Sequence, residues 1–270
     1  MNSHVPLQHQ LVIDRFIAAC QADARIVGAF LGGSYARGMA DAYSDLDLGL
    51  ITTDAAYDDF VAQCETFLCL LGKLVFVEDF GLPNIVFFIL HDGTEVELVL
   101  DRTSHFQHMH SGPYHILVDK TALLTNVVFP GNEPTPTEQR ETVRRLVSWF
   151  WHDLSHFITA IGRGQLWWAY GQLEELRRVC VNLARIQHNA MAQADGYEKV
   201  EHALPIEQLV PLQATCCPLE REAMVQSAWV IVRFYEEVAP QLTRRHNLSY
   251  PADLACVMST RLEQVGNAQV

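Results

Sequence analysis

The sequence predicts an α/β (α+β) domain with a mixed sheet over residues 1–130, followed by an all-α helical bundle over residues 135–270. Up to about residue 118, short apolar runs of strand length alternate with helical patterns, as in domains that mix strands and helices. A segment rich in proline and glycine, residues 129–137, then separates this part from long helical periodicity. We therefore expect two domains joined by a short linker.

The first domain is expected to begin with a helix over residues 7–22, because Leu11, Phe16 and Cys20 recur at helical spacing. The pair Asp92-Gly93 is typical of a hairpin turn between two strands. Further helices are predicted over residues 54–71 and 104–110, and strands over residues 25–31, 45–51, 74–77, 84–90, 94–100 and 115–118.

The second domain is expected to be a bundle of four long helices with one or two short ones. The apolar residues after the linker recur at helical spacing, and the chain shows no internal repeat. The long helices are predicted over residues 138–161, 165–193, 219–242 and 251–265.

Composition limits the partners of the chain. Its 270 residues carry a formal net charge of −13, which disfavours nucleic acid as a partner and suits a cationic small molecule.

Seven cysteines, an odd number without C-x-x-C spacing, favour a reducing setting. The first ten residues lack a secretory apolar core, and no apolar run is long enough to cross a membrane. We expect a cytoplasmic protein, and nothing in the sequence decides between a monomer and a homodimer.

The most informative segment runs from Gly32 to Asp47 and contains Gly33-Ser34, Arg37 and Asp45-Leu46-Asp47. Glycines permit a tight turn whose backbone N–H groups bind anions, and a serine adds a hydroxyl. Two aspartates that are two apart in a strand share one face, about 6.6 Å apart along the chain. Such carboxylates suit Mg²⁺, which leaves room for substrate phosphates. The pattern therefore predicts nucleotide chemistry, with Asp45 and Asp47 as metal ligands.

The segment GGSYARGMADAYSDLDLGL resembles the signature of the DNA polymerase beta-like nucleotidyltransferase superfamily. It is most similar to the antibiotic-modifying branch, with its aminoglycoside adenylyltransferases and lincosamide nucleotidyltransferases. The resemblance implies Mg²⁺-dependent transfer of a nucleoside monophosphate, from ATP or another NTP, to a hydroxyl of a small-molecule acceptor. By the same resemblance, Gly33 and Ser34 contact phosphates. Arg37 either reaches a phosphate or pairs with a neighbouring aspartate.

The superfamily usually carries a third acid on a later strand, and GTEVELVLD supplies two candidates. Glu95 and Glu97 share one face of the predicted strand, while Val96 and Leu98 point to the core. Glu97 matches the family pattern better and is assigned as the general base, with Glu95 as the alternative. A carboxylate beside two other acids should have a raised pKa, which suits a base.

The helical half also resembles this branch. The segment SWFWHDLSHFITAIGRGQLWWAYGQLEELRR is similar to the helical domain of streptomycin-type adenylyltransferases. Tyr170 and Glu174, or the neighbouring Glu175, are candidates for contacting the acceptor. Two other functions stay open, namely a nucleotidyltransferase of a toxin–antitoxin or regulatory system that modifies protein or RNA, and a non-catalytic nucleotide sensor.

Overall fold

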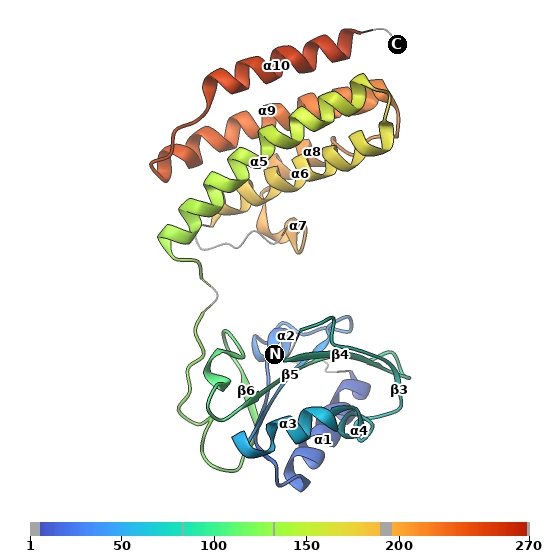
Figure 1. Cartoon of the computed structure of the whole chain (residues 1–270), viewed down its shortest axis with the longest axis vertical. Helices are drawn as coiled ribbons and strands as arrows, with labels where there is room; N and C mark the ends of the chain where they lie inside the picture. The colour runs from blue at the N-terminus through green and yellow to red at the C-terminus, as the bar shows by residue number, and fades with distance from the viewer. Residues whose placement is uncertain (1–5, 83, 132, 190–195, 269–270) are drawn as a thin grey trace. The chain divides into compact units, whose positions relative to one another are not determined.

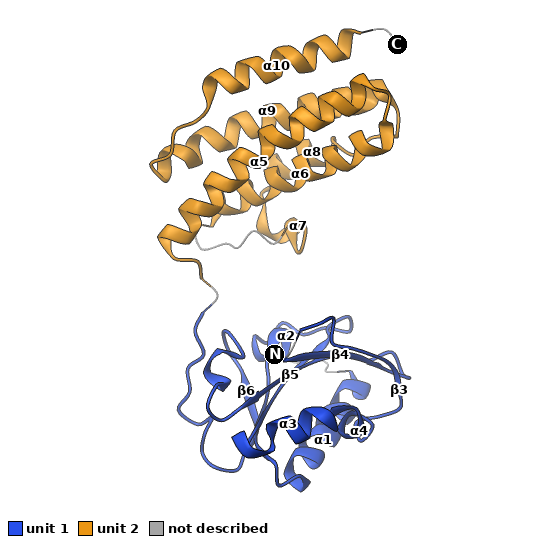
Figure 2. Cartoon of the chain, viewed as in Figure 1, with its two compact units in different colours: residues 1–132 blue, residues 133–270 orange. Residues whose placement is uncertain are grey.

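A computed structural model of the chain describes residues 6–82, 84–131, 133–189 and 196–268 (Figure 1). The chain divides into two compact units, residues 1–132 and residues 133–270 (Figure 2). The first contains a mixed six-stranded sheet with helices, and the second is helical, so the predicted fold class is confirmed. None of the described helices is long and apolar enough to span a membrane.

The sheet has the strand order β3-β4-β5-β2-β1-β6. Its central pair, β2 and β5, is parallel, and all the other neighbouring pairs are antiparallel. The strands are β1 (Ile26–Leu31), β2 (Leu46–Thr52), β3 (Leu74–Glu78), β4 (Ile85–Leu90), β5 (Glu95–Arg102) and β6 (His115–Asp119). The parallel pair matters most for function, because it brings together two segments about fifty residues apart in the sequence.

One face of the sheet is covered by α1 (Leu7–Ala22), α3 (Tyr57–Ala62) and α4 (Cys64–Leu68) (Figure 1). Phe16 and Phe67 meet edge to face in the resulting core. A smaller cluster around Phe30 and Phe129 packs beside β1. The remaining elements of this unit are α2 (Gly33–Ala36) and the 3₁₀ turns η1 (Asp54–Ala56) and η2 (Phe106–His108).

The helix predicted over residues 54–71 is wrong as a single element. It is divided into η1, α3 and α4, with a break at Gln63, where φ is −110° and ψ is 9°. Phe60, Cys64 and Phe67 form one buried stripe across the break, so the apolar spacing stays helical although the backbone does not. The predicted helix over residues 104–110 is reduced to the single turn η2.

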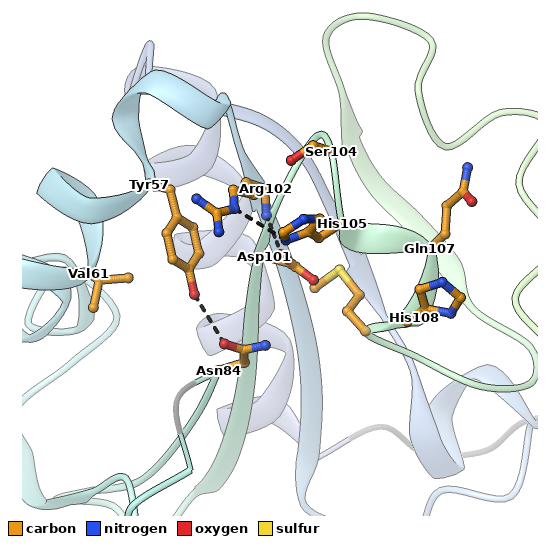
Figure 3. Close-up of a pocket in the computed structure, with 10 residues that line it drawn as sticks. Tyr57, Val61, Asn84, Asp101, Arg102, Ser104, His105, Gln107 and His108 are labelled. Carbon is orange, nitrogen blue, oxygen red and sulfur yellow. Dashed lines mark hydrogen bonds between the residues drawn. The ribbon is translucent and has the colours of Figure 1, made fainter.

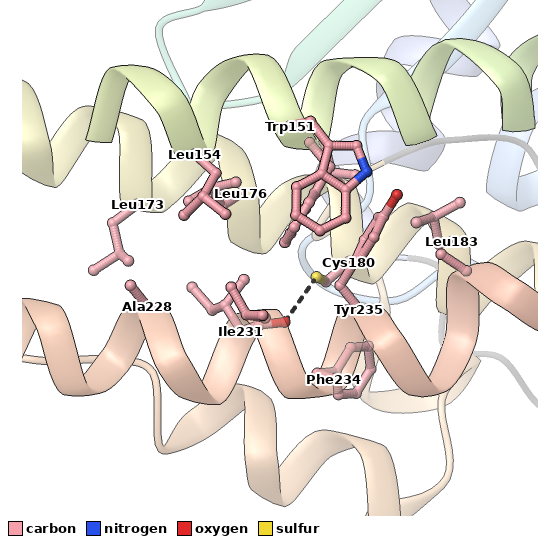
Figure 4. Packing of buried hydrophobic residues seen from close by; sticks show 14 of the residues in the cluster. Trp151, Leu154, Leu173, Leu176, Cys180, Leu183, Ala228, Ile231, Phe234 and Tyr235 are labelled. Carbon is pink, nitrogen blue, oxygen red and sulfur yellow. Dashed lines mark hydrogen bonds between the residues drawn. The ribbon is translucent and has the colours of Figure 1, made fainter. Parts of the chain in front are cut away.

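The second unit contains α5 (Pro136–Gly162), α6 (Leu166–His188), α9 (Arg221–Arg245) and α10 (Ala252–Asn267), with the short α7 (Val200–Ala203) and α8 (Ile206–Gln213). Thr135 and Glu138 form a capping box that starts α5. The core lies where α5, α6 and α9 meet (Figure 4). Phe150 stacks on Tyr235 there, with ring centroids 3.6 Å apart. Residues 190–193 of the predicted second long helix lie outside the described residues.

Candidate active site

The glycine–serine turn lies directly on a carboxylate. β1 ends at Leu31, and the single helical turn α2 follows. The backbone N–H of Gly32 donates to the carbonyl oxygen of Asp47 at 2.8 Å, which ties the turn to β2. Gly33 has a φ of +55°, and a Cβ built on it would lie 1.5 Å from Oδ2 of Asp47. Only glycine fits this position, because both the backbone conformation and the aspartate exclude a side chain.

Ser34 presents polar groups beside the same carboxylate. Its backbone N–H is close enough to the Asp47 side chain to lower the pKa of that carboxyl. Its hydroxyl is buried and finds no hydrogen-bond partner among the described residues. A buried polar atom without a partner is costly and needs an explanation. A ligand oxygen at the turn would satisfy this hydroxyl.

Three acids gather at one end of the parallel strand pair. The register places Asp47 of β2 opposite Glu97 of β5. Both side chains are half-buried, whereas Asp45, directly before β2, is exposed. Glu95 is exposed and precedes the first residue of β5 that pairs with β2. Of the two candidate glutamates, the strand register therefore brings Glu97 alongside Asp47.

The electrostatics of this cluster favour protonation. Burial raises the pKa of Asp47, and the charge of Asp45 raises it further, while Arg37 and His110 lower it. Burial also raises the pKa of Glu97, with added contributions from Asp47 and then Asp45. The negative charges are therefore mutually destabilising in the protein alone, and a cation placed among them would be held strongly.

Arg37 is free for a ligand. It ends α2, and its exposed side chain forms no ion pair with any described residue, including Asp41 and Asp45. The Asp41 carboxylate instead accepts hydrogen bonds from the Tyr43 N–H and the Ser44 hydroxyl. The planar guanidinium is thus available to a phosphate near the turn.

Two histidines that sequence reasoning did not connect with the site support the turn. The buried ring of His9, from α1, shares a hydrogen bond with the hydroxyl of Tyr35 in α2. On another side, Cε1 of His110 lies 2.7 Å from where a Cβ on Gly32 would be. His110 also packs against Phe30 and bonds the carbonyl oxygen of Pro113. No local sequence pattern predicts either contact, because both contacts join segments that are far apart in the chain.

The candidates in the second unit lie on α6. Glu174 forms an ion pair with Arg177, whose guanidinium also bonds Thr215. The ion pair lies within α6, and it helps to fix Arg177, which bonds the segment after α8. Tyr170 lies one turn earlier and is 39% exposed.

Glu175, the neighbour of Glu174, lines a pocket of about 390 Å³ between α5 and α6. Trp149, Asp153 and Arg178 contribute to the same wall, and Arg178 forms an ion pair with Glu175. This pocket combines an aromatic ring with two carboxylates. Neither Glu174 nor Tyr170 lines it.

Comparison with known proteins identifies the family. The model of the streptomycin adenylyltransferase family matches residues 8–265. An aminoglycoside 6-adenyltransferase from Bacillus subtilis is 14% identical, with 97% of this chain and 98% of that chain covered and a TM-score of 0.44. A nucleotidyltransferase-like protein from Exiguobacterium sibiricum 255-15 is 12% identical, with 95% and 86% covered and a TM-score of 0.37.

No curated protein sequence matches the chain. The family match spans nearly all of both units, and it agrees with a turn and acid cluster suited to nucleotide chemistry. The chain therefore belongs to the streptomycin adenylyltransferase family and is a nucleotidyltransferase.

Proposed function

We propose that this enzyme transfers AMP from ATP, with Mg²⁺, to a hydroxyl group of an aminoglycoside antibiotic. The first unit carries the catalytic residues, and the helical unit binds the acceptor. One observation supports the chemistry above all, namely that the Asp47 carboxylate lies on the Gly33–Ser34 turn and opposite Glu97. The choice of an aminoglycoside over a lincosamide rests on the family match.

The turn is assigned to the triphosphate. In this assignment, the unpartnered hydroxyl of Ser34 and the backbone N–H groups of the turn at Gly33 bind phosphate oxygens. Arg37 adds a guanidinium that has no carboxylate partner among the described residues and can form paired hydrogen bonds to a phosphate. These three residues hold and orient the nucleotide for in-line attack.

Asp45 and Asp47 are the residues that would hold Mg²⁺. They fit in donor type, because carboxylate oxygens are hard ligands. Burial and then the charge of Asp45 raise the pKa of Asp47, and a cation bound between the two carboxylates would favour their ionised forms. Among the described residues, no group of three His, Cys, Asp or Glu side chains is placed to hold a metal ion by itself, so these two aspartates are proposed as ligands only together with the bound nucleotide. When bound, Mg²⁺ neutralises charge on the phosphates.

Glu97 is assigned as the general base. Its raised pKa brings it closer to the range in which a carboxylate accepts a proton efficiently. Glu97 takes the proton of the acceptor hydroxyl, and the oxygen forms a bond to the α-phosphorus. The bond from that phosphorus to the bridging oxygen breaks, and pyrophosphate leaves with the electron pair.

The acceptor is expected to be polycationic. The net charge of −13 attracts cations and disfavours anionic acceptors. In the helical unit, Asp153 and Glu175 can pair with ammonium groups, and the exposed ring of Trp149 can cover an apolar sugar face. Glu175 lines this pocket and Glu174 does not, so Glu175 is now the better acceptor-binding candidate of the two, and an ammonium group of the acceptor would take the place of Arg178 as its ion-pair partner.

Pyrophosphate release tests this proposal. The full chain is incubated with Mg²⁺, each of the four NTPs, and a panel of aminoglycosides and lincosamides, in parallel with Asp47→Asn. We expect release only with ATP and an aminoglycoside, and its loss in the variant. Glu97→Gln should lose far more turnover than its matched control on the same strand face, Glu95→Gln. Nucleotide binding without release for any drug would favour a macromolecular acceptor or a sensor instead.

A further inference from the structure

A second pocket of the catalytic unit lies away from the acid cluster. It has a volume of about 560 Å³ and is formed by the end of β5, the start of α3, the segment before β4 and the region of η2 (Figure 3). Its wall includes Tyr57, Asn84, Asp101, Arg102 and His105. None of these residues has a role in the proposed nucleotidyl transfer.

The strand register separates this pocket from the catalytic acids. Asp47 pairs with Glu97, whereas Ile51 pairs with Asp101, four residues further along both parallel strands. At the rise of an extended strand, four residues correspond to roughly 13 Å. The two sites therefore lie at opposite ends of the same strand pair.

Arg102 contributes a positive charge to the pocket wall. Its guanidinium lies over the ring of Tyr57, 5.1 Å from the centroid. Its Nε donates to Nδ1 of His105 at 3.4 Å. Within the described residues, Arg102 forms no ion pair. The stacking and the hydrogen bond hold the side chain in place and leave its terminal nitrogens for a ligand.

The hydrogen bonds of the wall leave two further N–H donors unused. The hydroxyl of Tyr57 donates to Oδ1 of Asn84 at 3.2 Å, so the amide nitrogen of Asn84 is left to donate. Because Nδ1 of His105 accepts from Arg102, the ring proton lies on Nε2, a second unused donor. Figure 3 shows these side chains around one hollow.

The nearby carboxylates are already engaged. Asp54 accepts from the Thr103 hydroxyl and from both the N–H and the hydroxyl of Ser104. Oδ1 of Asp101 accepts from the Arg102 N–H at 2.8 Å. The Asp101 charge offsets part of the Arg102 charge, so the preference of the pocket for an anion rests on the Arg102 guanidinium and on the N–H donors of Asn84 and His105.

We propose that this pocket is an accessory oxyanion site that binds a phosphate group, separate from the site of nucleotidyl transfer. Arg102 supplies the charge, and His105 and Asn84 supply additional N–H donors. The phosphate group belongs either to free inorganic phosphate or to a nucleoside monophosphate. This assignment does not depend on the identity of the antibiotic or on turnover.

Calorimetric titration of the full chain without Mg²⁺ tests the site, with inorganic phosphate and AMP as separate probes. Arg102→Gln removes the charge, and Asn84→Asp replaces a donor by an anion while it keeps an acceptor for Tyr57. Arg233→Gln removes one charge from an exposed position of α9 and is the matched control. Arg37→Gln weakens phosphate binding at the catalytic turn.

We expect a binding event whose Kd rises about tenfold or more in Arg102→Gln and in Asn84→Asp. The same event should change less than about twofold in Arg233→Gln and in Arg37→Gln. Stronger binding of AMP than of phosphate would assign the site to a nucleotide, and the reverse would assign it to the free ion. Binding that only Arg37→Gln weakens, or no saturable binding of either probe, would overturn the inference.

Discussion

Replacing Gly33 by alanine tests whether catalysis requires the close contact between the glycine–serine turn and Asp47. A Cβ at this position would lie 1.5 Å from Oδ2 of Asp47, whereas ordinary contact begins at 3.4 Å. The two groups must therefore move apart by about 1.9 Å, since 3.4 minus 1.5 is 1.9. Displacement of a reacting group by about 1 Å can cost on the order of 100-fold in rate. We expect Gly33→Ala to lose turnover by at least that factor.

Gly38→Ala is the matched control for this substitution. Gly38 belongs to the same loop and has a φ of +67°, but no heavy atom lies within 4 Å of the position that a Cβ would take there. Alanine in the left-handed region costs roughly 1–2 kcal/mol at either position, a loss of several degrees in Tm. The two variants should therefore lose similar stability from the backbone, while only Gly33→Ala loses the site.

The assay measures pyrophosphate release with Mg²⁺, ATP and the accepted aminoglycoside at a temperature well below the Tm of all the proteins. Differential scanning fluorimetry supplies the Tm values. Turnover of Gly33→Ala within about threefold of Gly38→Ala would refute the reasoning, because it would mean that Asp47 need not stay on the turn. Equal and large losses in both variants would refute it as well, since the Cβ contact would then explain nothing.

Three further predictions concern stability and pH. Burial and neighbouring acids raise the Glu97 pKa, so its protonated form stabilises the fold below the ordinary carboxyl range of about 4, and this stability is lost as the pH rises through the raised pKa. Glu97→Gln should accordingly raise the Tm by roughly 1–3 °C at pH 8 and by nothing at pH 4, in scans without Mg²⁺. Tyr35→Phe leaves a buried ring nitrogen of His9 unpartnered and should cost about 1–3 kcal/mol in urea unfolding, while Tyr43→Phe, at a residue 96% exposed, should cost nothing measurable. Thr135→Ala removes the capping box of α5 and should cost about 1 kcal/mol in the same measurement.

The elements of the fold could be predicted where periodicity and backbone agree. The strands that became β2 and β5 have alternating polar and apolar residues, so the sequence placed Asp47 on one strand and Glu97 on another. It could not pair the strands with each other, because their register is decided by packing between segments about fifty residues apart. That register also places Glu97 rather than Glu95 alongside Asp47, in agreement with the family pattern, whereas polar–apolar alternation alone leaves the two glutamates equivalent.

The break at Gln63 marks a second limit. An apolar stripe at Phe60, Cys64 and Phe67 satisfies the core equally well as one helix or as two. Side chains outside the stripe meet at the break, where Arg25 bonds both Asp59 and Gln63. Contacts of this kind come from tertiary structure, and periodicity in a single segment does not contain them.

The contacts that support the glycine–serine turn were the part of the site that the sequence predicted least. Asp47 and Glu97 repel each other and are partly buried, so the acid cluster alone destabilises the fold. The turn nevertheless stays on Asp47 because it is held from three directions, by the hydrogen bond from Gly32 to β2, by the His9–Tyr35 pair from α1, and by His110. The residues that make these contacts are separated by up to about a hundred positions, and none of them belongs to a recognisable local motif. A site that is unfavourable by itself requires such distant contacts, so the residues that make it possible are the ones that local sequence patterns reveal least.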